Sequence, residues 1–152
     1  MIAFRGYTHI SINIALFLIL RDYFIINRPI GLVIIFLALG SVLADIDHPS
    51  SIIGKFFIPI NAVVKHRNGY THSLLGAFLF TVPILLIDKV YFVTALVGYI
   101  SHLLVDTLTP AGVKWLFPFK NKSYSLKVAR TGGPEEVIIL GLSLLYIFKT
   151  KL

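Results

Sequence analysis

Histidine and carboxylate side chains recur at the ends of long apolar stretches of this chain. Those that we expect to bind a metal ion share this position: His9, Asp45, Asp47, His72, His102 and Asp106. His102 and Asp106 are four residues apart, so on a helix they share one face and can both bind one ion. Imidazole and carboxylate ligands in a chain without cysteine favour zinc, manganese, iron or magnesium. The sequence therefore predicts a site for a divalent cation, with zinc as the first choice.

Three further residues are candidates for catalysis: His66, Arg67 and Glu136. A histidine or carboxylate that is not a metal ligand can act as a general acid or base, which suits His66 and Glu136. Arg67 carries a planar guanidinium group that fits a phosphoryl group, so we expect it to bind substrate. Glu136 follows Gly133-Pro134, and an alternative is that it only stabilises the start of a helix.

The composition sets the class of protein that positions these side chains. The chain has 152 residues, of which 57% are hydrophobic and only 14% are charged, and its mean hydropathy is +0.86. A soluble domain is nearer one quarter charged, and a disordered chain has few apolar residues, so both classes are excluded. The absence of cysteine excludes disulfides and thiolate ligands. We expect one integral-membrane domain over residues 1–152.

Five apolar stretches are candidates for membrane-spanning helices: Tyr7–Ile26, Pro29–Ala44, Ser73–Ile87, Tyr91–Val105 and Val137–Phe148. Their uninterrupted runs are shorter than the ~20 residues of a full span, so polar residues at their ends must continue the helices into the headgroup region. The predicted fold class is all-α, a polytopic bundle of about five short transmembrane helices.

Two long polar segments, 45–72 and 106–134, connect these stretches on one side of the membrane. The first carries apolar residues at helical spacing, which predicts a helix lying in the interface. The second mixes Trp115 with lysines, a composition typical of the headgroup layer. More Lys and Arg residues fall on this side than opposite, which places the N-terminus and the site in the cytoplasm. Lipid headgroups also account for the net charge of +7, and we expect no nucleic-acid partner because no motif for reading one is present.

Three motifs together resemble one protein family. They are Asp45-Ile46-Asp47-His48, Thr71-His72-Ser73-Leu74 and His102-Leu103-Leu104-Val105-Asp106-Thr107. This set resembles the YdjM-type proteins, which are described as LexA-regulated, membrane-bound, metal-dependent hydrolases. The likeness runs from His9 to about Glu136, although Ala44 stands where the family usually has proline. The resemblance implies hydrolysis at a membrane but does not identify the substrate.

The predicted function is therefore a membrane-bound, metal-dependent hydrolase. Because the candidate site lies at headgroup depth, a phospholipid or another lipid-linked phosphoester is the expected substrate, cleaved by metal-activated water. A metal transporter or sensor is one alternative, although transporters usually bind their substrate near the bilayer midplane. A non-catalytic scaffold with a structural metal site is another. The sequence leaves the oligomeric state open.

Overall fold

A computed structural model describes residues 6–23, 26–49, 51, 53–56, 69–130 and 132–150 of the chain. Its α-helices are α1 (Gly6–Leu20), α2 (Ile30–Leu43), α4 (Leu74–Thr81), α5 (Lys89–Thr107) and α6 (Pro134–Thr150). Short 3-10 helices occupy Arg21–Tyr23, Gly54–Phe56 and Val82–Leu86. An isolated antiparallel bridge joins Val113 and Tyr124, and these described residues form no strand. The all-α prediction is confirmed.

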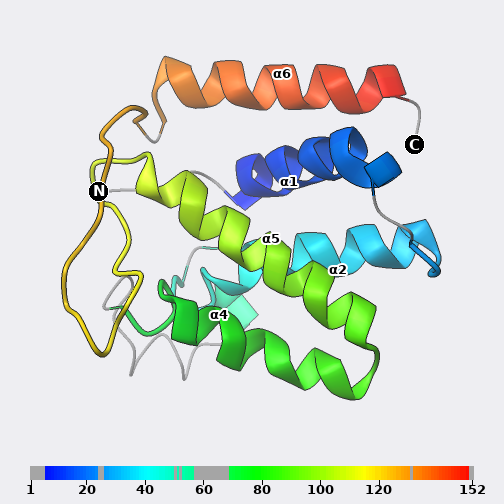
Figure 1. Ribbon diagram of the computed structural model, residues 1–152. Coiled ribbons are helices and arrows are strands. Elements are labelled where there is room, and N and C mark those ends of the chain that lie inside the picture. Colours follow the sequence, from blue (N-terminus) through cyan, green and yellow to red (C-terminus); the bar gives the residue numbers. More distant parts are fainter. Residues whose placement is uncertain are drawn as a thin grey trace.

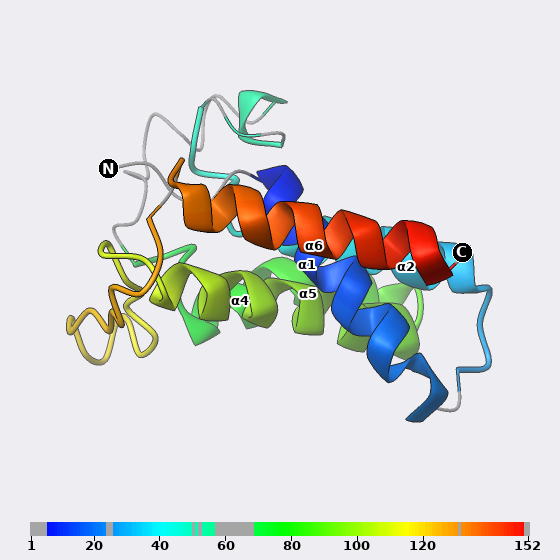
Figure 2. The ribbon, with the colours of Figure 1, turned by 90° about the horizontal axis from the view of Figure 1, so that it is seen from above.

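The helices are layered around the pair formed by α2 and α5. These two helices make the most extensive contact of the fold, and α1 packs on both of them. In Figure 1, α6 lies above α1, α5 crosses the centre diagonally, and α4 lies below. Figure 2, seen from above, shows α1 crossing obliquely beneath α6. The site described below lies where α1, α2, α4 and α5 meet, and α6 packs on the outer side of α1.

Two glycines allow α2 and α5 to approach closely. A Cβ atom added to Gly40 of α2 would collide with the carbonyl oxygen of Ala95, and one added to Gly98 of α5 would collide with that of Leu37. Small residues at a helix crossing let the two backbones come together, as they do in membrane proteins. This close crossing brings the backbone of α2 within reach of side chains on α5.

A small apolar core fixes the segment that precedes α4. Tyr99 and Leu103 of α5 are fully buried and pack with Ala77 of α4 and with Val113. The hydroxyl of Tyr99 donates a hydrogen bond to the carbonyl oxygen of Thr71 at 2.7 Å. The chain just before α4 is thus held against α5.

The predicted membrane spans correspond to helices, but the helices differ in length. Among the described residues, α5 is the one helix long and apolar enough to cross a membrane, whereas α2 and the segment Leu74–Leu86 are apolar but shorter. Five separate crossings therefore stay a prediction. The first helix ends at Leu20, earlier than the expected Ile26, where the charged pair Arg21-Asp22 begins a 3-10 turn.

Two further expectations meet the structure only in part. The third stretch is not one α-helix, because it continues as a 3-10 helix from Val82, next to Pro83, which cannot donate a backbone hydrogen bond. The predicted interfacial helix falls largely on residues 57–68, which lie outside the described residues. Its described part forms the short 3-10 helix Gly54–Phe56.

Ser73 caps the N-terminus of α4. Its side chain accepts a hydrogen bond from the backbone N–H of Gly76 at 3.1 Å. We expect Ser73→Ala to lower the free energy of unfolding by about 1 kcal/mol, because the cap is lost, and Ser73→Thr to retain most of it. Unfolding of detergent-solubilised protein followed by circular dichroism measures both. Equal losses in the two variants would contradict the capping role.

Candidate metal centre

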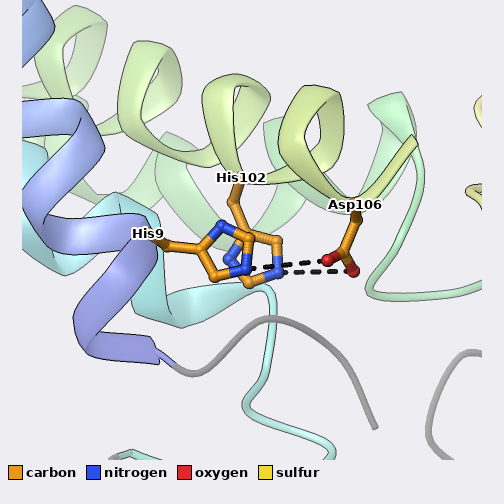
Figure 3. A group of neighbouring side chains, drawn as sticks. All are labelled: His9, His102 and Asp106. Carbon is orange, nitrogen blue, oxygen red and sulfur yellow. Dashed lines mark ion pairs between the residues drawn. The ribbon is translucent and has the colours of Figure 1, made fainter. Parts of the chain in front are cut away.

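Five of the predicted metal ligands come together in the structure, from four separate segments. They are His9 of α1, Asp45 in the turn after α2, His72 just before α4, and His102 and Asp106 of α5. All five are buried. Figure 3 shows His9 and His102 side by side, both directed toward Asp106. The fold thus joins residues that are far apart in the sequence.

Two carboxylates face three imidazole nitrogens. Asp106 Oδ1 lies 3.6 Å from His9 Nε2. The other oxygen of this carboxylate, Oδ2, lies 3.4 Å from His72 Nε2 and 3.8 Å from His102 Nε2. Asp45 Oδ1 lies 3.6 Å from His72 Nε2 and 3.7 Å from His102 Nε2. Each carboxylate therefore faces more than one histidine.

The histidine rings are held in defined orientations. His9 and His102 stack with their centroids 3.8 Å apart and their planes 16° apart (Figure 3). His72 meets the ring of His102 nearly edge-on, at 5.6 Å between centroids. This packing fixes the three rings with their Nε2 atoms toward the carboxylates.

The tautomer of His102 follows from its backbone contact. Its Nδ1 lies 2.7 Å from the carbonyl oxygen of Ser41 on α2. A carbonyl can only accept, so Nδ1 carries the hydrogen and neutral His102 has its lone pair on Nε2. A hydrogen bond of this kind orients most histidines that bind metals. The close crossing of α2 and α5 makes this contact possible.

The donor atoms fit a divalent cation. His102 Nε2 and Asp45 Oδ1 are buried, and within the described part of the chain neither has a hydrogen-bond partner. Native proteins rarely bury polar atoms in this state. Donors about 2.1 Å from a zinc ion at tetrahedral angles are roughly 3.4 Å apart, close to the 3.4–3.8 Å separations at this site. The two negative charges of Asp45 and Asp106, together with neutral imidazole ligands, also balance the +2 charge of such a cation.

The electrostatics of the cluster favour added positive charge. Burial alone would lower the pKa of His72, but its interactions with Asp106 and Asp45 outweigh burial and raise the pKa to about 9. Burial alone would raise the pKa of Asp45, but His102 and His72 outweigh burial and hold the pKa below its ordinary value. The two carboxylates thus stabilise positive charge at His72.

Asp47 lies beside this cluster and reaches it through Thr71. The Thr71 hydroxyl donates to Asp47 Oδ2 at 2.8 Å and lies 2.9 Å from His72 Nδ1. Because the Thr71 hydroxyl hydrogen points to Asp47, the Thr71 oxygen accepts a hydrogen bond from the Nδ1–H of His72. The Nε2 atom of His72 then faces the carboxylates of Asp45 and Asp106. The structure thus gives Asp47 a supporting contact, and its predicted role as a direct ligand stays a prediction.

Thr71→Val tests this supporting contact. Valine has nearly the same shape as threonine but cannot bridge Asp47 and His72. We expect metal affinity to fall by about 10- to 100-fold while the stoichiometry at saturating metal is unchanged. Isothermal titration with zinc measures the affinity. Thr94→Val is the matched control, because the Thr94 hydroxyl donates within α5, to the carbonyl oxygen of Val90. If Thr71→Val bound zinc as tightly as Thr94→Val, Asp47 and Thr71 would not support the metal site.

Glu136 joins the first turn of α6 to α1. Its carboxylate accepts hydrogen bonds from the Thr8 hydroxyl at 2.8 Å and from the Gly132 backbone N–H at 2.6 Å. Thr8 precedes the candidate ligand His9, so Glu136 supports the segment that carries this histidine. A catalytic role for Glu136 stays a prediction. The other predicted catalytic residues, His66 and Arg67, lie outside the described residues.

Sequence reasoning missed two supports of the site. The carbonyl oxygen of Ser41 orients His102, but a backbone atom leaves no signal in residue types. Thr71 lies next to His72 within a motif that the sequence analysis did select. Its role was not predicted because the partner, Asp47, is brought to it only by the fold.

These observations define the class: an α-helical protein with an apolar span and a buried His/Asp cluster suited to a metal ion. The family model described as YdjM inner membrane protein matches residues 4–151, so the chain belongs to the YdjM family. Two relatives from Escherichia coli, YdjM and YbcI, are named as inner membrane proteins, which supports a membrane location for this chain.

Individual relatives give the extent of the similarity. The chain is 42% identical over 91 residues to inner membrane protein YdjM of Escherichia coli, covering 53% of this chain and 46% of that protein. It is 33% identical over 114 residues to the protein YvsG of Bacillus subtilis, covering 70% of this chain and 71% of that protein. The match thus spans about half the length of Escherichia coli YdjM. No solved structure matches the chain.

Proposed function

We propose that this chain is a membrane-embedded, metal-dependent hydrolase that cleaves phosphoesters at the headgroup level. The convergence of three imidazole nitrogens and two carboxylates in one buried cluster carries the proposal. Zinc suits this donor set first, with manganese, iron and magnesium as alternatives. The relatives' membrane location supports a lipid-linked substrate.

The chain's own residues have distinct roles in this proposal. One ion, or a pair of ions, would be held by two groups of side chains that share His102: His9, His102 and Asp106, and Asp45, His72 and His102. When bound, the metal supplies Lewis-acid activation of water and of the phosphoryl group. Hydrolysis adds the water oxygen to phosphorus, breaks the ester P–O bond and passes a proton to the leaving oxygen. In this proposal His66 or Glu136 moves the proton, and Arg67 binds the phosphoryl oxygens.

The proposed topology places the site at the cytoplasmic face. The ligands lie near the start of α1, just after α2, just before α4 and toward the end of α5. If the helices cross the membrane in turn, these positions fall on one side. The lysine-rich segment after α5 lies on the same side and suits anionic headgroups.

Phosphate release from lipid substrates tests the proposal. Metal-loaded protein in detergent is given phosphatidic acid in mixed micelles, and the same protein is given a water-soluble phosphomonoester. We expect release of phosphate from the lipid and its loss after chelation of the metal. Cleavage of the soluble ester alone would exclude the lipid substrate, and cleavage of neither would exclude this phosphatase activity.

A structural metal site is a second candidate, favoured by burial. The side chains of His102 and Asp106 have no solvent-exposed area, and that of Asp45 is 9% exposed. A substrate must therefore approach from the side of Asp45 or after a local opening. If the metal is only structural, its removal lowers the unfolding temperature while no phosphoester is cleaved at any metal occupancy.

A further inference from the structure

We propose that Asp106 bridges two metal ions, one on each of its carboxylate oxygens. This inference rests on the proposed function, because it states how many ions the same cluster holds and divides the ligands between them. On the Oδ1 side the ligand is His9. On the Oδ2 side the ligands are His72, His102 and Asp45. The stacking of the His9 and His102 rings carries the inference.

The stacked rings of His9 and His102 are oriented for two different ions. The lone pair of an imidazole nitrogen lies in the plane of its ring, so a bound metal ion lies near that plane. The two ring centroids are 3.8 Å apart and the planes are tilted by only 16°. Two such planes do not meet within bonding distance of the Nε2 atoms, which is about 2.0–2.1 Å for zinc. An ion in the plane of one ring is therefore displaced from the plane of the other.

The two rings face the two oxygens of one carboxylate. His9 Nε2 is 3.6 Å from Asp106 Oδ1, and His102 Nε2 is 3.8 Å from Asp106 Oδ2. Figure 3 shows these two contacts side by side. An ion in each position would have one imidazole nitrogen and one oxygen of Asp106 as ligands. Paired ions in phosphatases and nucleases are about 3.5–4 Å apart, which matches the 3.8 Å spacing of the rings.

The Oδ2 side of Asp106 has a full set of four donors. The ring of His72 is inclined by 67° to that of His102, so the planes of these two rings do intersect. The Nε2 atoms of both histidines lie 3.4 and 3.8 Å from Asp106 Oδ2. They lie 3.6 and 3.7 Å from Asp45 Oδ1. Two nitrogens and two oxygens at these separations suit one tetrahedral ion.

The Oδ1 side of Asp106 has fewer ligands. Of the two groups of side chains that could hold a metal in the described part of the chain, only His9 and Oδ1 of Asp106 remain for the second ion. An ion with two protein ligands has coordination positions left for water, which hydrolysis requires. We therefore expect the ion at His9 to bind more weakly than the ion at His72 and His102.

Metal stoichiometry and electron paramagnetic resonance test the bridge without requiring turnover. The full chain in detergent is stripped of metal with a chelator and titrated with zinc, or with cobalt(II) as a paramagnetic probe. We expect two zinc ions per chain at saturation and a spin-coupled cobalt signal.

His9→Phe separates the two ions, because phenylalanine keeps a planar ring against His102 but has no ligand nitrogen. We expect this variant to bind one zinc ion, with the affinity of the tighter site little changed, and to lose the spin coupling. His72→Ala is expected to weaken the tighter site instead. Ser11→Ala is the matched control on α1, because the Ser11 hydroxyl donates within the helix, to the carbonyl oxygen of Tyr7. It should bind two ions.

The outcomes separate the bridge from the chemistry. One zinc ion per chain at saturation in the wild type would overturn the bridge and leave a hydrolase with a single ion. Two ions without spin coupling would place the second ion away from Asp106 and overturn it as well. If His9→Phe does not fold, judged by circular dichroism, His9→Ala gives the same comparison. Two coupled ions in a protein that cleaves no phosphoester would reject the proposed function while retaining the bridge.

Discussion

Asp106→Ala is expected to weaken metal binding by more than about 100-fold, because loss of a ligand exceeds the cost of losing a supporting hydrogen bond. Asp106 faces all three histidines, with Oδ1 toward His9 and Oδ2 toward His72 and His102. Its removal also leaves His72 with one facing carboxylate, that of Asp45. Elemental analysis of detergent-purified protein after dialysis against zinc measures the loss.

The control for this variant is Asp22→Ala. Asp22 is exposed in the 3-10 turn after α1, where its ion pair with Arg21 is at 3.7 Å. It removes the same charge from the chain but touches no candidate ligand in the structure. We expect it to bind metal like the wild type. Equal metal content in Asp22→Ala and Asp106→Ala would show that the cluster is not the metal site.

Gly98→Ala is expected to have the largest effect on folding. A Cβ at this position would collide with the carbonyl oxygen of Leu37, which is backbone and cannot turn aside. Separating α2 from α5 would also move Ser41 away from His102, whose contact crosses the same interface. Overpacking of this kind costs about 1–3 kcal/mol, and more where backbone must shift. Thermal unfolding in detergent is the measurement.

The matched control is Gly141→Ala on α6. A Cβ added to Gly141 meets no atom within 4 Å. Alanine is the better helix former, so this variant should be more stable than the wild type by about 0.5–1 kcal/mol. A Gly98→Ala protein as stable as Gly141→Ala would mean that α2 and α5 do not cross as closely as described.

Part of the site followed from sequence spacing alone. His102 and Asp106 were predicted to share a helical face, and both lie on α5 with their facing atoms 3.8 Å apart. Asp45 and Asp47 were predicted where a helix ends and the chain turns, and α2 ends at Leu43 just before them. Such local relations are fixed by helical geometry, so residue types and intervals are enough to predict them.

The remaining features depend on long-range packing. Whether Asp47 faces the cluster directly or through Thr71 depends on how two distant segments meet. The bond between Thr8 and Glu136 joins the two ends of the sequence. The first α-helix ends at Leu20, whereas the sequence predicted an apolar stretch to Ile26 because apolar residues continue past Arg21. The spacing of residues along the sequence carries no information about contacts between distant segments.

X-ray absorption spectroscopy of the zinc-loaded wild-type protein tests the central claim most directly. The account predicts a first shell of nitrogen and oxygen at about 2.0–2.2 Å, with outer-shell scattering from several imidazole rings. Zinc that is not retained, or retained with an oxygen-only shell and no imidazole scattering, would contradict the claim that this histidine and aspartate cluster binds metal.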